Sequence, residues 1–252
     1  MTPKVIVITG ASRGIGLAVA RFLLRAPQSH NVVVVARSRE PLESLKSQYP
    51  TQVQVVCGDL SDSATVKEAV ELALETWGRL DSLVLNHGIL EAKRVEDHEI
   101  EAWRRTFDVN YFSVVEFVKE ALCHLRRWRG NIIITSSGAV TTGYATWGAY
   151  GASKAAINHL VLTLSNEEKL VTSISIRPGV VDTEMQREIR EFHSTAMDQK
   201  DAERFRTLKE QGGLLKPEQP GHVIAKLAVG APQELSGKFL SWNDPALAAF
   251  QD

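Results

Sequence analysis

Two residues with acid–base chemistry, Tyr150 and Lys154, stand four positions apart in the segment WGAYGASKAA, which is otherwise built mostly from small residues. Residues at this spacing share one face of a helix, where such a pair is usually a half-buried ring beside a solvated amine. The pair can also serve as a proton donor. A free tyrosine, with a pKa of about 10, transfers protons poorly near neutrality. A lysine ammonium one helical turn away would lower that pKa.

A pair of hydroxyl groups lies upstream, at the end of the apolar stretch IIITSSG. The carboxyl ends of parallel strands open onto a binding cleft. A hydroxyl of Ser136 or Ser137 is therefore expected at the cleft, where it could hold a substrate oxygen. Reduction of a carbonyl by hydride would need the proton that Tyr150 can donate.

The elements that position these side chains alternate along the whole chain. Short β-branched runs are separated by helical patterns, for example over 62–76 and 99–128. Most runs are apolar throughout, which is typical of parallel strands buried on both faces. Repeated strand-then-helix order indicates a doubly wound sheet with right-handed crossovers. We therefore predict a single-domain, Rossmann-like α/β fold over 1–252, with helices on both faces of about seven parallel strands, at 4–9, 32–36, 53–57, 82–86, 131–135, 172–176 and 238–242.

One segment, 184–216, interrupts this rhythm. It is polar and helix-prone, contains no predicted strand, and leads into the stretch GGLLKPEQPG. A long insertion inside a compact domain is more often a lid or a binding segment than a simple connector. We predict that it is a substrate lid.

A glycine-rich stretch, TGASRGIG, follows the first predicted strand and leads into a helix. Gly10, Gly14 and Gly16 would let the backbone approach a pyrophosphate, and the helix N-terminus would supply free N–H groups. The spacing is G-x-x-x-G-x-G, and three glycines can also form a plain tight turn. The position at the first strand–helix junction favours dinucleotide binding. An oxidised nicotinamide beside Tyr150 would add to the effect of Lys154 on its pKa.

The end of the second strand, VVVVARSRE, indicates which dinucleotide binds. An acidic residue there would bind a ribose hydroxyl and mark NAD, but the position holds Arg37, followed by Ser38 and Arg39. Guanidinium groups, including that of Arg13 in the glycine loop, suit a 2′-phosphate. NADP(H) is the predicted cofactor, and a solvated loop arginine is the alternative. Asp59, after the third strand, is equally suited to meet the adenine and to form a turn or helix cap.

The composition excludes several other classes of protein. The 29 basic and 30 acidic residues leave no basic stripe for nucleic acid beyond RRWRG, which is typical of a helix end with a cap at Gly130. Cys57 and Cys123 are isolated and are predicted to be buried free thiols, and the seven histidines show no metal-ligand spacing. No signal peptide or membrane-spanning run is present, so we expect a cytoplasmic protein with no metal.

These motifs together resemble those of the classical short-chain dehydrogenases/reductases. The resemblance covers nearly the whole chain, in order and at the family's spacing: TGASRGIG, the NHG element at 86–88, Asn110, Ser137, YGASK at 150–154 and RPGVVDT at 177–183. It implies that Tyr150 is the proton donor and that Lys154 lowers its pKa and binds the nicotinamide ribose. It also implies that Ser137 orients the carbonyl and that Asn110 holds a water in a proton relay. The family's spacing favours Ser137 over Ser136.

The resemblance also implies the cofactor contacts. Pro178 and Gly179 shape a turn against the nicotinamide carboxamide, with Val181 and Thr183 as contacts. One departure is visible, because the family usually has N-N-A-G where this chain has Leu-Asn-His-Gly; we assign His87 no catalytic role. The predicted cofactor-binding residues are Gly10, Ser12, Arg13, Gly14, Ile15, Gly16, Arg37, Ser38, Asp59, Leu60, Asn86, Gly88, Tyr150, Lys154, Pro178, Gly179, Val181 and Thr183.

Three stretches, WGAYGASKAAINH, RPGVVDTEMQ and LSGKFLSWNDPAL, resemble the branch of sepiapterin reductases and fungal benzil reductases, and more closely the latter. The implied substrate is a vicinal dicarbonyl or a pterin side-chain ketone, reduced with NADPH to the hydroxyketone. Tyr144, Trp147 and Met185 are suited to wall a flat apolar diketone, although each is equally suited to ordinary packing. Asp244 matches the acid that anchors the pterin in sepiapterin reductases, and a turn-forming aspartate before proline is the alternative.

Other functions remain as alternatives. An NADP(H)-sensing protein with weak catalysis is one, although it would not need the complete set of catalytic residues. A dehydrogenase for another alcohol or ketone, such as a steroid or a sugar, is another. Helices over 99–128 and 150–170 carry broad apolar stripes, and in the family these helices often form a dimer interface. A homodimer that binds a small carbonyl compound is therefore expected.

Overall fold

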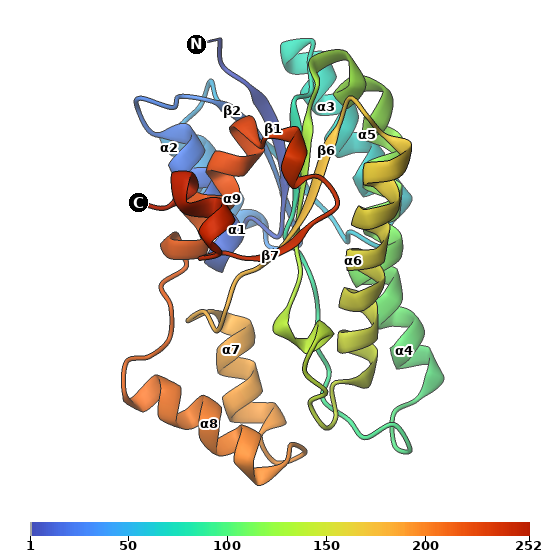
Figure 1. The fold of residues 1–252 in the computed structure, drawn as a ribbon. Helices are drawn as coiled ribbons and strands as arrows, with labels where there is room; N and C mark the ends of the chain where they lie inside the picture. Colours follow the sequence, from blue (N-terminus) through green and yellow to red (C-terminus); the bar gives the residue numbers. More distant parts are fainter. Residues whose placement is uncertain (1) are drawn as a thin grey trace.

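The structure is a computed structural model that describes residues 2–252. Its core is a parallel sheet of seven strands in the order β3-β2-β1-β4-β5-β6-β7 (Figure 1). This order reverses direction between β1 and β4, and such a switch point leaves a crevice at the carboxyl ends of the strands. The strands are β1 (Val5–Thr9), β2 (Asn31–Ala36), β3 (Val53–Cys57), β4 (Ser82–Leu85), β5 (Asn131–Thr135), β6 (Thr172–Arg177) and β7 (Phe239–Ser241). The predicted doubly wound fold and its strands are confirmed.

Helices cover both faces of the sheet, as Figure 1 shows. Successive residues of β1 alternate between two cores, with Ile6 and Ile8 in one and Val5 and Val7 in the other. A strand buried on both faces is apolar at every position, which explains the continuous apolar runs. One face carries α1 (Gly14–Leu24), α2 (Arg39–Gln48) and α9 (Glu218–Gly230), and the other carries α3 (Ser63–Trp77), α5 (Ser113–Trp128) and α6 (Gly148–Glu167).

The region predicted as one helix over 99–128 is interrupted. α4 (Ile100–Phe107) continues into α5 through a π-turn (Asp108–Phe112). At its end the Ser113 N–H donates to the carbonyl of Asp108, five residues back, so the helix holds one more residue per turn here. Segments of this kind are frequent at functional sites.

The end of α5 differs from the expected glycine cap. Arg129, not Gly130, adopts the left-handed conformation, with φ of 48°. Glycine is needed at position 130 for another reason, since a Cβ there would lie 2.4 Å from the carbonyl oxygen of Asp81.

The prediction of two buried thiols is also wrong, because Cys123 is exposed and Cys57 is half-buried.

The segment after β6 extends beyond the carboxyl ends of the strands, at the bottom of Figure 1. It contains α7 (Glu184–Glu188) and α8 (Gln199–Glu210). Its two ends are tied together, because the Leu215 N–H donates to the Val180 carbonyl at 2.9 Å and the Leu215 carbonyl accepts from the Asp182 N–H at 2.8 Å. Both helices are thereby fixed over the edge of the sheet that holds the crevice.

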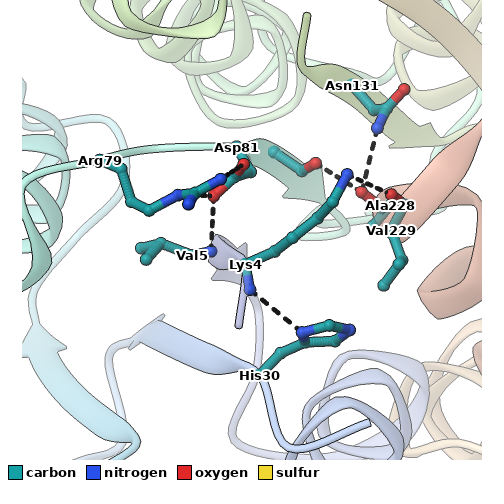
Figure 2. A network of polar contacts seen from close by, with 9 residues as sticks. Lys4, Val5, His30, Arg79, Asp81, Asn131, Ala228 and Val229 are labelled. Carbon is teal, nitrogen blue, oxygen red and sulfur yellow. Dashed lines mark hydrogen bonds and ion pairs between the residues drawn. The ribbon is translucent and has the colours of Figure 1, made fainter. Parts of the chain in front are cut away.

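At the amino ends of the strands, polar side chains close the last turn of α9 (Figure 2). Lys4 Nζ donates to the carbonyl of Val229 at 2.6 Å, and Asn131 Nδ2 donates to that of Ala228 at 3.1 Å. The last carbonyls of a helix have no partner within the helix, and a cation there also interacts favourably with the helix dipole. These bonds fix α9 against the starts of β1 and β5.

Asp81 is the buried acceptor at this edge of the sheet (Figure 2). Its carboxylate accepts from the Val5 N–H at 2.8 Å and from Nε of Arg79 at 2.8 Å, and the residue is 2% exposed. The carboxylate thus supplies the partner for the first N–H of β1, so it fixes where the central strand begins.

We expect Asp81→Ala to lower the free energy of unfolding by about 3 kcal/mol, because the Val5 N–H and the Arg79 guanidinium lose their buried partner. As a control, Glu43→Ala breaks the exposed ion pair with Arg39 and should cost less than about 1 kcal/mol. Urea unfolding of the two variants measures both costs. Equal losses would contradict the anchoring role of Asp81.

Candidate active site

The carboxyl ends of the strands open onto a cavity of about 330 Å³. It reaches from the loops after β1 and β2 to the helices of the segment after β6. Most residues predicted from the sequence to form the site line this cavity. The exceptions are Gly16, Asn110 and Asp244.

The loop between β1 and α1 presents backbone N–H groups at the cavity. Gly10 and Gly14 have φ of 64° and 56°, values that favour glycine. Arg13, the residue before α1, makes no side-chain capping bond, so the first N–H groups of the helix and its dipole are available to an anion. Gly16 allows close packing, since a Cβ there would lie 2.4 Å from the Gly10 carbonyl oxygen. This arrangement fits a pyrophosphate.

The arginines near the second strand have different surroundings. Arg37, directly after β2, lines the cavity. Arg13 also lines it and lies 3.9 Å from a carboxylate oxygen of Glu188 in α7. Arg39 forms an ion pair with Glu43 along α2 and is not among the lining residues. Of these three arginines, Arg37 and Arg13 are therefore the ones that a ligand in the cavity could reach.

Asp59 forms the turn that was considered for it, and it also lines the cavity. Its carboxylate accepts from the N–H of Ser61 at 3.0 Å, which makes a turn, and from Nη2 of Arg105 at 2.6 Å. Although burial alone would raise its pKa, the hydrogen bonds from Ser61 and Arg105 outweigh burial and lower the pKa to about 2. Asp59 and Arg105 both line the cavity, so an ionised carboxylate stands at its edge. Arg105 was not predicted from the sequence.

The predicted proton donor and its neighbours lie together at the centre of the cavity. Tyr150 and Lys154 are 7% and 3% exposed. Burial lowers the pKa of Lys154 to about 8, and its Nζ donates to the Thr135 carbonyl at 2.8 Å. Burial also raises the pKa of Tyr150, which a hydrogen bond with Ser137 partly offsets. Burial therefore favours the protonated form of the tyrosine.

The two adjacent serines have separate partners. Ser136 Oγ donates to Oδ1 of Asn158 on α6 at 2.8 Å, which occupies its proton in a structural bond. Ser137 Oγ accepts from the Ala139 N–H at 3.1 Å and faces Tyr150. The geometry thus favours Ser137 as the hydroxyl beside the proton donor, as the spacing predicted.

Comparison with known proteins places this geometry in a family. A family model described as short chain dehydrogenase matches residues 4–194. The chain belongs to the short-chain dehydrogenase/reductase family. It is thus an oxidoreductase of a family that uses a nicotinamide cofactor.

Two yeast relatives and one archaeal structure illustrate the similarity to this family. The chain is 43% identical over 250 residues to YIR035C, an uncharacterized oxidoreductase of Saccharomyces cerevisiae, with 98% of each chain covered. The crystal structure of that protein matches with a TM-score of 0.97 and 42% identity, covering 99% of this chain and 100% of that one. A benzil reductase ((S)-benzoin forming) of the same yeast, IRC24, is 40% identical over 260 residues, covering 98% and 99%. An alcohol dehydrogenase from Thermococcus sibiricus, complexed with 5-hydroxy-NADP, is 28% identical with a TM-score of 0.76, covering 94% and 95%.

Asn110, at the centre of the π-turn, is fully buried, so its side chain acts on the site through the loop after β4. Its Oδ1 accepts from the Ile89 N–H at 2.8 Å, and its Nδ2 donates to the Ile89 carbonyl at 2.9 Å and to Ser153 Oγ at 3.1 Å. A Cβ at Gly88 would lie 3.3 Å from Asn110 Oδ1 and 3.4 Å from Lys154 Nζ. The glycine of the family's N-N-A-G pattern therefore lets this loop pass close to the catalytic lysine.

The turn after β6 requires a glycine at position 179. Gly179 has φ of 81°, and a Cβ there would lie 2.6 Å from Leu215 Cδ1. Thr183 accepts from the Gln186 N–H and so caps α7, and a Cβ at Gly14 would lie 3.1 Å from its Cγ2. The turn thus approaches the glycine loop at the cavity.

The other end of the cavity is aromatic. Trp147 stacks on Phe205 of α8 with ring centroids 5.8 Å apart and an angle of 8° between the rings, and Tyr144 lies 4.6 Å from Trp147. Met185 packs against the same cluster, and Arg204 donates to the Tyr144 hydroxyl at 2.9 Å. The sequence analysis missed Phe205 and Arg204. A single aromatic residue in the otherwise polar helix α8 was the signal available for Phe205.

Asp244 lies outside the cavity lining. Its side chain accepts from the Ala246 N–H at 2.9 Å and caps the short 3₁₀ helix Pro245–Phe250. The structure thus supports the turn-forming alternative for this residue.

Among residues 2–252, no group of three or more His, Cys, Asp or Glu side chains is arranged to hold a metal. No helix in this described range is long and apolar enough to cross a membrane.

Proposed function

We propose that this protein is an NADPH-dependent carbonyl reductase whose substrate is a vicinal dicarbonyl, such as an aromatic diketone, or a sepiapterin-like ketone. The product is the hydroxyketone. The observation that carries the proposal is the aromatic end of the cavity beside Ser137 and Tyr150. Trp147, Phe205 and Tyr144 offer flat apolar surfaces for an aryl group. The benzil reductase IRC24, 40% identical along nearly the whole chain, supports the same substrate class.

The preference for NADPH is proposed from Arg37. A guanidinium at the end of β2 can pair with a 2′-phosphate through charge-assisted hydrogen bonds, whereas NAD enzymes of this fold place an acid there. Ser38 and Arg13 also line the cavity. The free N–H groups at the start of α1 would hold the pyrophosphate, and the ionised Asp59 with Leu60 would border the adenine.

When bound, the nicotinamide would supply the hydride for the carbonyl carbon. Ser137 donates a hydrogen bond to the substrate oxygen and holds it against Tyr150. The Tyr150 hydroxyl gives its proton to that oxygen as negative charge develops there, and the raised pKa keeps this proton in place at neutral pH. Lys154 contributes its ammonium charge and would bind the nicotinamide ribose. Asn110, whose side chain bonds to Ile89 and Ser153, would support the relay water that returns a proton to Tyr150 by fixing the loop beside Lys154. Val181 and Thr183 hold the carboxamide.

Two structural features of the proposal concern access and assembly. Met185 and Phe205 place residues 184–216 against the cavity, so we propose that this part of the single domain acts as a lid over the substrate.

The predicted homodimer would use the outer face of α5 and α6. Phe112, which ends the π-turn directly before α5, is 56% exposed, and Leu162 of α6 is 50% exposed, which leaves apolar surface for a partner copy.

The proposal is tested by following the consumption of NADPH, and separately of NADH, with benzil, an aliphatic diketone, sepiapterin and a simple monoketone. We expect rapid NADPH-dependent reduction of the dicarbonyls and slow reaction with the monoketone. Tight binding of NADPH without turnover of any compound would favour the NADP(H)-sensing alternative. Faster turnover of steroids or sugars would favour a different dehydrogenase.

A further inference from the structure

The loop after β4 departs from the family pattern at a buried position, His87, which stands where the family usually has alanine. The residue is 7% exposed. Its Nδ1 lies 2.6 Å from Thr9 Oγ1, and its Nε2 lies 2.9 Å from the Val109 carbonyl oxygen and 2.7 Å from Ser113 Oγ. The imidazole thus joins the end of β1, just before the glycine loop, to the helix that carries Asn110.

The bond to the Val109 carbonyl assigns one tautomer to this imidazole. A carbonyl oxygen can only accept, so Nε2 must carry the proton in a bond to Val109. Nδ1 is then an acceptor, and the Thr9 hydroxyl donates to it. Burial, with a smaller contribution from the charge of Lys154, lowers the pKa of His87 to about 3, which keeps the ring neutral. His87 therefore acts as a fixed hydrogen-bonding bridge and not as a proton carrier.

The carbonyl that His87 binds belongs to the π-turn. A π-turn is rare compared with an α-helical turn, so contacts from the surrounding structure are needed to hold it. Two side-chain donors lie at the Val109 carbonyl: Nε2 of His87 and the Ser113 hydroxyl, at 2.7 Å. Ser113 belongs to the same helix and moves with it. Of these two donors, His87 is the one that ties the π-turn to the sheet.

We infer that His87 is a positioning residue whose Nε2–H holds the Val109 carbonyl and thereby fixes the π-turn that presents Asn110. Asn110 is the next residue along the chain, and it pins Ile89 by two hydrogen bonds beside Lys154. A shift of the π-turn would therefore displace both the relay asparagine and the loop against the catalytic lysine. The catalytic part of this inference rests on the proposed function, whereas the structural part does not.

Two substitutions separate the bridging bond from the mere presence of a polar side chain. The amide nitrogen of glutamine can occupy the place of the imidazole Nε2, whereas asparagine reaches only as far as Nδ1. We expect His87→Gln to retain kcat within about threefold and His87→Asn to lose about 10- to 100-fold, because misplacement by about 1 Å costs this much. The Kd for NADPH should change less than kcat in either variant, since the glycine loop and the start of α1 keep their own contacts. Equal kcat values for the two variants would overturn the inference.

Ser113→Ala is the matched control, because it removes the other donor to Val109 and leaves the imidazole in place. It should keep near-normal kcat. Amide hydrogen exchange of residues 108–114 supplies a readout without turnover: faster exchange in His87→Asn than in His87→Gln and Ser113→Ala supports the inference, and equal exchange contradicts it. If the wild type reduces none of the compounds tested, the proposed function fails while this exchange comparison still tests His87.

A measurement on the unaltered protein covers the case in which His87→Asn does not fold. The ¹⁵N chemical shifts of the His87 ring report its tautomer. We expect a neutral Nε2–H ring that does not titrate across the neutral range. An Nδ1–H tautomer or a protonated ring would contradict the bridge to Val109.

Discussion

Tyr150→Phe is expected to lower kcat for diketone reduction by about 10²- to 10⁴-fold, because it removes the hydroxyl that gives its proton to the substrate oxygen. The ring is buried and packs edge-to-face on Trp147 at 5.8 Å, so phenylalanine preserves its packing. The fold and the Kd for NADPH should therefore change little. Stopped-flow consumption of NADPH gives the rate of hydride transfer, and fluorescence titration gives the affinity.

Tyr49→Phe is the matched control for this substitution. Tyr49 packs against the core beside α2 and does not line the cavity, so its hydroxyl should be dispensable for turnover. A Tyr150→Phe enzyme that keeps most of its rate would contradict the assignment of the proton donor. A loss of NADPH affinity equal to the loss of rate would show instead that the hydroxyl serves binding.

The sheet could be predicted from the sequence because each of its central strands meets two apolar cores. Ile6 and Val7 point to opposite faces, so the chain must be apolar at successive positions, and this pattern is visible without a structure. Gly10 and Gly14 were likewise predictable, since a left-handed backbone at a strand–helix junction requires glycine. Predictions of this kind depend only on residues that are near one another in the sequence.

The π-turn could not be predicted in the same way. Asp108–Phe112 continues the helical pattern of α4 and α5, and the extra residue is stabilised by His87, which lies 22 positions before Val109. The stacking of Phe205 on Trp147 and the pairing of Asp59 with Arg105 also join distant segments. Asp244, by contrast, accepts from the N–H two residues further along and so caps the helix that follows it. This local role was the alternative that its position before proline suggested. The parts of the site that escaped prediction are those made by long-range contacts.

The choice between the two cofactors should depend mainly on Arg37. We expect Arg37→Ala to weaken NADPH binding by about 10- to 100-fold, since a charge-assisted hydrogen bond contributes about 1.5–3 kcal/mol. NADH has no 2′-phosphate, so its Kd should change by less than about threefold. Titration of each variant with both cofactors, at fixed ionic strength because such contacts are screened by salt, measures the ratio of the two Kd values.

Arg39→Ala provides the matched control for Arg37→Ala, because it removes the same charge two residues away. Arg39 is held by Glu43 along α2 and does not line the cavity. It can therefore contribute little beyond long-range electrostatic attraction of the phosphate. If Arg37 contacts the 2′-phosphate directly, Arg37→Ala must weaken NADPH binding more than Arg39→Ala does. The two substitutions must then have similar effects on the Kd for NADH. Equal changes in the Kd for NADPH would show that Arg37 contributes only through its charge and not through direct contact. Equal losses of NADPH and NADH in Arg37→Ala would show that this arginine does not recognise the 2′-phosphate.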